Sequence, residues 1–65
     1  MKLMHVASGR EIKVGSIVIA KGGKTARVVS IREPQKPNAK GKVFVEMVDG
    51  TRDGFTPNVF GATFE

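Results

Sequence analysis

Short apolar segments alternate with turn residues along the whole chain. Eight glycines and three prolines leave no window of ten residues in which apolar positions recur with helical spacing. The segments between them are rich in Val, Ile, Thr and Phe, which favour strands. The pattern therefore predicts an all-β chain of five to six short strands.

The first half of the chain contains the stretch EIKVGSIVIA, with alternating apolar positions on both sides of Gly15. We expect Gly15 to mark a bend or bulge, because a glycine tolerates the sharp backbone turn. Residues 1–10 are expected to form a weak or mobile N-terminal strand. The sequence KGGK at 21–24 predicts a two-residue hairpin turn, since both glycines accept positive φ.

The second half begins with the strand TARVVSIR, whose apolar residues do not alternate cleanly. Pro34 and Pro37 cannot donate to a ladder, so this strand must end near Arg32. KVFVEMV is the clearest strand, and Asp49-Gly50 predicts the turn after it. TPNVF is typical of one helical turn with proline at its first position, followed by a closing strand ATFE.

Sixty-five residues allow one domain, 1–65, with a small core. The economical arrangement is a strongly bent barrel that pairs most of its strand edges, with one helical turn before the last strand. Phe55 and Phe64 are expected to cover its ends. The predicted core consists of Val14, Ile17, Ile19, Val28, Ile31, Val43, Val45, Met47, Val59 and Phe60.

Candidate chemistry is sparse. The chain has no cysteine and one histidine, His5, which no carboxylate accompanies at a spacing that implies pairing. Asp49 and Asp53 bracket a hairpin, where aspartate is a common turn residue. We therefore expect a protein that is not an enzyme and has no metal or cofactor. The longest apolar run, 17–20, is too short to cross a bilayer, so the expected location is cytoplasmic.

The charge is concentrated in one part of the chain. The formal net charge is +5, and residues 24–42 hold six of the eleven cations and one acid, Glu33. From residue 43 onward, four acids oppose Arg52 alone. A localised basic segment is typical of a protein that binds a polyanion, although lysines on loops also serve solubility.

The order of glycines, aliphatic strands and turns in KVGSIVIAKGGKTARVVSI and GKVFVEMVDG resembles the Src-homology-type small barrel, and within it the KOW-like modules of transcription and ribosomal proteins. The similarity covers about residues 13–50, and the turn TPNVF also resembles the Src-homology arrangement. A KOW motif would have a glycine where this chain has Ala26-Arg27. The resemblance implies a small β-barrel associated with nucleic acid or nucleoprotein complexes.

Other binding modes need residues that this chain lacks. Recognition of proline-rich or methyl-lysine ligands needs tyrosine and tryptophan, and both are absent. The sequence therefore predicts weakly sequence-specific binding of RNA or DNA by a basic rim, made of the Gly-Gly hairpin and the 32–42 connector. Phe44 and Phe55 are candidates for base stacking. The candidate phosphate-binding residues are Lys21, Lys24, Arg27, Arg32, Lys36, Lys40 and Lys42.

The alternative function is that of a protein-interaction or assembly module, as in accessory or phage-encoded proteins of this size. Such a module would dock on its protein partner through the apolar segment 55–64. In either case we expect a monomer or a weak homo-oligomer that has no membrane partner.

Overall fold

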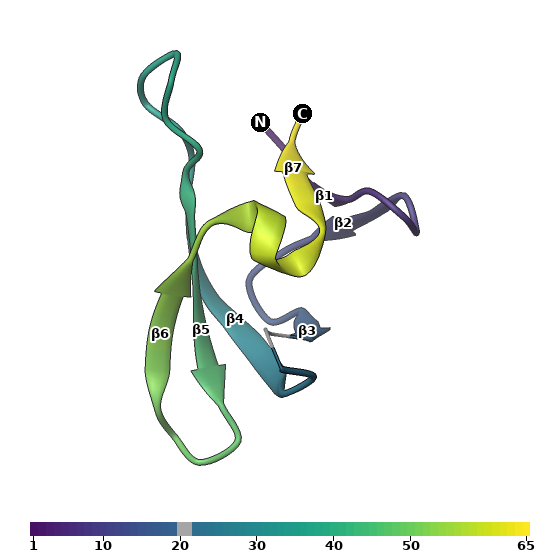
Figure 1. The fold of residues 1–65 in the computed structure, drawn as a ribbon, viewed down its shortest axis with the longest axis vertical. Coiled ribbons are helices and arrows are strands. Elements are labelled where there is room, and N and C mark those ends of the chain that lie inside the picture. Colours follow the sequence, from purple (N-terminus) through teal and green to yellow (C-terminus); the bar gives the residue numbers. More distant parts are fainter. Residues whose placement is uncertain (20–21) are drawn as a thin grey trace.

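The computed structural model describes residues 1–19 and 22–65, which fold into seven strands and one short helical turn (Figure 1). The elements, in chain order, are β1 (Leu3–His5), β2 (Arg10–Ile12), β3 (Ile17–Ile19), β4 (Thr25–Arg32), β5 (Lys42–Met47), β6 (Arg52–Phe55), the 3₁₀ turn η1 (Pro57–Phe60) and β7 (Ala62–Phe64).

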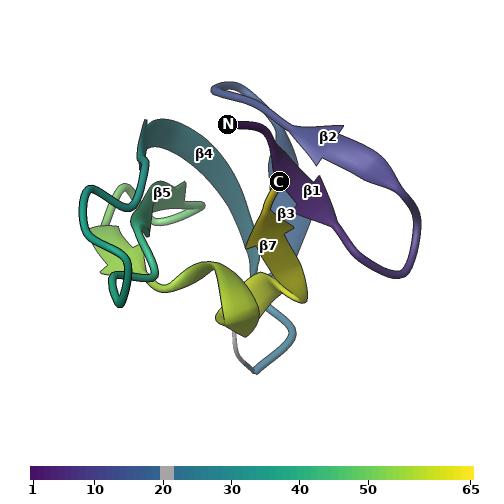
Figure 2. The same cartoon turned by 90° about the horizontal axis from the view of Figure 1, so that it is seen from above.

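The strands form two antiparallel sheets. One has the order β2-β1-β7, and the other has the order β3-β4-β5-β6. The all-β class and the helical turn before the last strand are thus confirmed, but the described residues form seven strands instead of the expected five to six. The closed barrel is not confirmed. Within the described residues, no strand of one sheet pairs with a strand of the other; β6 and β7, for example, are separated by η1 and do not pair. Figure 2 shows β4 and β5 on one side of the molecule and β1, β2 and β7 on the other.

The N-terminal strand is not peripheral to the fold. β1 is the central strand of its sheet and pairs with both β2 and β7. Leu3 is 2% exposed, and Lys2 and Glu65 exchange two backbone hydrogen bonds. The segment that we expected to be weak therefore holds the two ends of the chain together.

The long pair β4–β5 organises the core. Val28, Val43 and Val45 are almost completely buried, and Val28 pairs with Val45. The register then shifts between Val28 and Ser30, so Val29 is the extra residue of a β-bulge. The bulge explains why the apolar residues of β4 do not alternate in the sequence.

The predicted phase of β3 is wrong. Val18 is buried opposite Ala26, whereas Ile17 and Ile19 are 63% and 66% exposed. The pairing with β4 decides the phase, since Ala26 faces the core and its partner must do so too. Val14 is also 64% exposed, because it belongs to the turn at Gly15, where φ is +96°.

Two predicted turns differ in detail from the structure. The KGGK turn lies partly outside the described residues. Gly22 and Gly23 both have positive φ as expected, but Ile19 lies opposite Thr25, whereas a two-residue turn at 22–23 would place it opposite Ala26. The β5–β6 turn expected at Asp49-Gly50 is a three-residue loop, 48–50, since the N–H of Met47 donates to the carbonyl of Thr51 at 2.7 Å. Gly50 ends this loop at a φ of +87°, which is typical of a type I turn followed by a bulge.

The end of β4 and the helical turn follow the prediction. β4 ends at Arg32, two residues before Pro34. Thr56 precedes η1, and Pro57 is at its start, but the Thr56 side chain makes no capping hydrogen bond. Beyond β4, residues 33–41 form a connector arm that extends away from both sheets (Figure 1).

Gly41 ends the connector arm at a position where no side chain fits. Its φ is +75°, and an added Cβ would lie 2.6 Å from Cε2 of Phe64 and 2.7 Å from the carbonyl oxygen of Arg32. Gly50 has a similar φ, but an added Cβ there meets nothing within 4 Å. An alanine at Gly50 would therefore have an unfavourable φ alone, whereas an alanine at Gly41 would have an unfavourable φ and a steric clash.

We predict that Gly41→Ala destabilises the protein more than Gly50→Ala. Both substitutions place alanine in the left-handed region, at about 1–2 kcal/mol, and Gly41→Ala adds a clash of at least about 1 kcal/mol. Urea denaturation of the two variants measures the difference. Equal free energies of unfolding would contradict the contact between Phe64 and the base of the arm.

Candidate nucleic-acid interface

The side of the β4-β5-β6 sheet that faces away from the core, here called the outer face, carries residues in register across the three strands. Phe44 lies at its centre, between Ser30 on β4 and Gly54 on β6. Toward the connector arm, Arg32 pairs with Lys42. On the other side of Phe44 is a row made of Arg27, Glu46 and Arg52.

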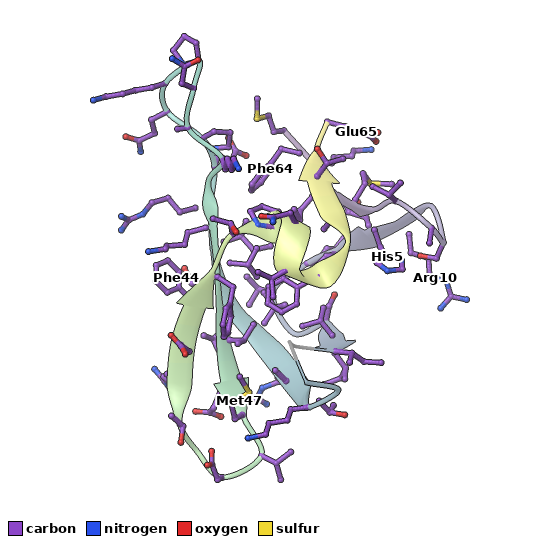
Figure 3. All side chains as sticks on the ribbon, in the orientation of Figure 1. His5, Arg10, Phe44, Met47, Phe64 and Glu65 are labelled. Carbon is purple, nitrogen blue, oxygen red and sulfur yellow. The ribbon has the colours of Figure 1, made fainter. Side chains whose placement is uncertain are left out.

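Phe44 lies on the outer face because its neighbours Val43 and Val45 point into the core. An added Cβ on Gly54 would lie 2.8 Å from Cε1 of Phe44, so the ring covers Gly54. The guanidinium carbon of Arg32 lies 5.8 Å from the ring centroid, within reach of a cation–π interaction. Figure 3 shows Phe44 on the side of the sheet opposite Phe64.

Glu46 neutralises the row beyond Phe44. Its carboxylate accepts a hydrogen bond from Nη2 of Arg27 at 3.2 Å and from Nε of Arg52 at 3.1 Å. The two arginines are well exposed, but both form an ion pair with the same carboxylate, that of Glu46. Arg27 is therefore a weaker candidate for phosphate binding than its charge alone indicates.

The connector arm and its base, next to the outer face, are strongly cationic. The backbone N–H of Ala39 donates to the carbonyl of Lys36 at 3.0 Å, which forms a turn at the tip of the arm with Lys36 and Lys40 on either side. Arg32 and Lys42 lie at the base of the arm. Among the described residues, none of these four cations has a carboxylate within 4.0 Å.

The connector's single acid is already paired. Glu33 accepts a hydrogen bond at 3.3 Å from the amino group of Met1. Both groups are about half exposed, so the pair adds little to stability. It does mean that the acid does not neutralise the lysines of the arm.

Lys24 precedes the other end of β4, about 26 Å from Arg32 at the usual rise per strand residue. Its neighbours there include Asp49, Thr51 and Asp53. The pKa of Asp49 is lowered, chiefly because its carboxylate accepts a hydrogen bond from the backbone N–H of Thr51, with a smaller contribution from Lys24. The Gly-Gly hairpin and the connector therefore do not form one continuous rim. Lys21 lies outside the described residues.

Phe55 and the C-terminal segment are committed to packing. The ring of Phe55 contacts that of Phe60 edge-on, with centroids 5.6 Å apart, and it packs on the core cluster. Pro57, Phe60 and Ala62 are buried. The structure thus separates the two stacking candidates, with Phe44 on the outer face and Phe55 inside.

The chain's single histidine lies away from this surface. His5 lies near Ser8, whose Oγ is 2.7 Å from Nδ1 of the imidazole, on the other sheet. Residues 1–19 and 22–65 hold no group of three His, Cys, Asp or Glu side chains placed to bind a metal ion. In the same described part of the chain, no helix has the length and hydropathy needed to span a bilayer.

Sequence reasoning missed Arg52 and Gly54. Both follow the β5–β6 turn, and only the three-residue loop places Gly54 opposite Phe44. A two-residue turn at Asp49-Gly50 would have placed Phe55 there instead. The φ preference of Gly50 was the available signal, but it does not distinguish the two loop lengths.

No known protein family, curated protein or solved structure matches this chain.

Proposed function

We propose that this protein binds nucleic acid through the outer face and the connector arm. The observation that carries the proposal is the separation of charge along β4, with four cations at the arm end that no described carboxylate neutralises. Phosphate binding needs lysine and arginine on a shared surface without strict spacing.

Phe44 adds a second kind of contact to this surface. Its ring lies beside Arg32 and Lys42 and between two small neighbours, Ser30 and Gly54. Such a ring offers a stacking surface to an unpaired base while the cations contact the flanking phosphates. The proposed ligand is therefore single-stranded RNA or DNA, bound with weak sequence preference.

The arrangement of the strands is in keeping with the Src-homology-type resemblance. β4, β5 and β6 are consecutive neighbours, η1 follows, and the last strand returns to pair with the first. We propose that the protein is related to the KOW-like modules, because of this strand order and the sequence resemblance over residues 13–50. Docking of a partner on the side chains of 55–64 is less favoured, since Phe60 and Ala62 are 6% exposed.

We predict that replacing Lys36, Lys40 and Lys42 together by Ala weakens binding of a single-stranded oligonucleotide without unfolding the protein. The slope of log affinity against log salt should fall by about 2, since each lost phosphate contact contributes about 0.7. Fluorescence anisotropy at several salt concentrations measures the slope.

The matched control removes three exposed cations in or next to the strands of the other sheet, with the changes Lys2→Ala, Arg10→Ala and Lys13→Ala. It changes the net charge equally, so an equal loss of affinity would indicate a non-specific charge effect and contradict the proposed surface. Absence of binding by the unmodified protein at low salt would overturn the proposal altogether.

We further predict that Phe44→Ala lowers affinity for a single-stranded oligonucleotide by about 5- to 150-fold, the effect of about 1–3 kcal/mol of stacking. Binding to a duplex, whose bases are already stacked, should change little. Val48→Ala, at a 91% exposed apolar side chain, is the control. An equal change for both ligands would show that Phe44 supports the fold and does not stack on a base.

A further inference from the structure

A second surface lies on the other side of the connector arm. A cleft of about 650 Å³ separates the arm from β7 and the start of η1. Figure 3 shows Phe64 projecting from β7 toward the arm. The cleft is lined by Met1, Pro34, Gln35, Lys36, Pro37, Ala39, Lys40, Pro57, Asn58, Ala62, Thr63 and Phe64.

β7 presents a free backbone edge. In the order β2-β1-β7 it is an outer strand, and within residues 1–19 and 22–65 its only partner strand is β1. Lys2 and Glu65 exchange backbone hydrogen bonds of 2.8 and 2.7 Å, and the N–H of Val6 donates to Gly61 at 2.9 Å. These contacts define which pairs of the ladder are hydrogen-bonded.

Hydrogen-bonded and non-hydrogen-bonded pairs alternate in an antiparallel ladder. Met4–Thr63 is therefore the hydrogen-bonded pair between the two just described, and Leu3–Phe64 and His5–Ala62 are not hydrogen-bonded. The N–H and C=O groups of Ala62 and Phe64 consequently point away from β1. They lie on the free edge of β7, and both residues line the cleft.

The chemistry of the cleft defines its ligand. An extended polypeptide offers alternating N–H and C=O groups that match those of an edge strand. Phosphate oxygens accept hydrogen bonds but donate none, so nucleic acid matches this edge less well. The cleft contains Lys36 and Lys40, and its described lining includes no carboxylate, which favours an acidic ligand.

We propose that an extended acidic segment of a partner protein adds to the free edge of β7, beneath the connector arm. Backbone bonds to Ala62 and Phe64 would hold the segment, and Lys36 and Lys40 would select its charge. The docking module considered from the sequence would thus use the backbone of the C-terminal segment, whose apolar side chains are buried. This inference goes beyond nucleic-acid binding and involves backbone atoms that the outer face does not use.

Hydrogen exchange followed by NMR tests the proposal, with a blocked hexapeptide of alternating valine and glutamate as the probe. In the free protein, the amides of Thr63 and Glu65 should exchange slowly, because they donate to Met4 and Lys2, whereas those of Ala62 and Phe64 should exchange fast. Saturating peptide should slow Ala62 and Phe64 by at least about tenfold. The matched control is the same peptide with lysine in place of glutamate, which should not bind.

Three results would overturn the proposal: no binding of the glutamate peptide, equal binding of the lysine peptide, or binding without protection of Ala62 and Phe64. Lys36 and Lys40 are shared with the proposed nucleic-acid surface, so the Phe44→Ala variant separates the two functions. It should bind the peptide normally, whereas its affinity for the oligonucleotide falls. Loss of both activities in that variant would also count against a separate peptide site.

Discussion

The register of β4 against β5 is the constraint on which the rest of the structure depends. Val28 faces Val45 in the core, and one extra residue, Val29, then shifts the pairing so that Ser30 faces Phe44. Arg27 and Arg32 are an odd number of residues apart, so a regular strand would place them on opposite faces. The bulge places both on the outer face, and a single inserted residue thereby arranges the candidate site.

The same register distributes charge. Glu46 lies between Arg27 and Arg52 and accepts a hydrogen bond from each, so this row is close to neutral. Beyond Phe44, Arg32 and Lys42 pair with each other and lead into an arm that carries two further lysines. Like charges directly opposite each other cost stability, and a polyanion bound at this position would relieve that repulsion.

Local signals predicted much of the fold. Pro34 correctly indicated the end of β4, which lies two residues before it. The alternation in KVFVEMV gave the correct faces of β5. Both signals depend only on residues close in the sequence. The sequence could not predict which side chains of β3 face the core, since all four residues of 17–20 are apolar. Only the pairing with β4 determines that Val18 is buried. The central position of β1 depends on pairing with residues 62–64, a contact that no local pattern reports.

The basic segment can be recognised in the sequence, but its arrangement in space cannot. Arg32 pairs with Lys42 at the base of the arm, and Lys36 and Lys40 lie at the turn of its tip. Lys24 does not join them, since the eight residues of β4 intervene. The sequence shows that a segment is basic. The length of the strand between two loops determines whether the cations of both loops can contact the same ligand.

A ¹⁵N-resolved NMR titration with a short oligothymidine at low salt shows which end of β4 binds nucleic acid. We expect shifts that cluster at Arg32, Lys36, Lys40, Lys42 and Phe44 and leave the β5–β6 turn unchanged. Shifts centred on Lys24 and the 48–51 turn, or no shifts at low salt, would contradict this expectation.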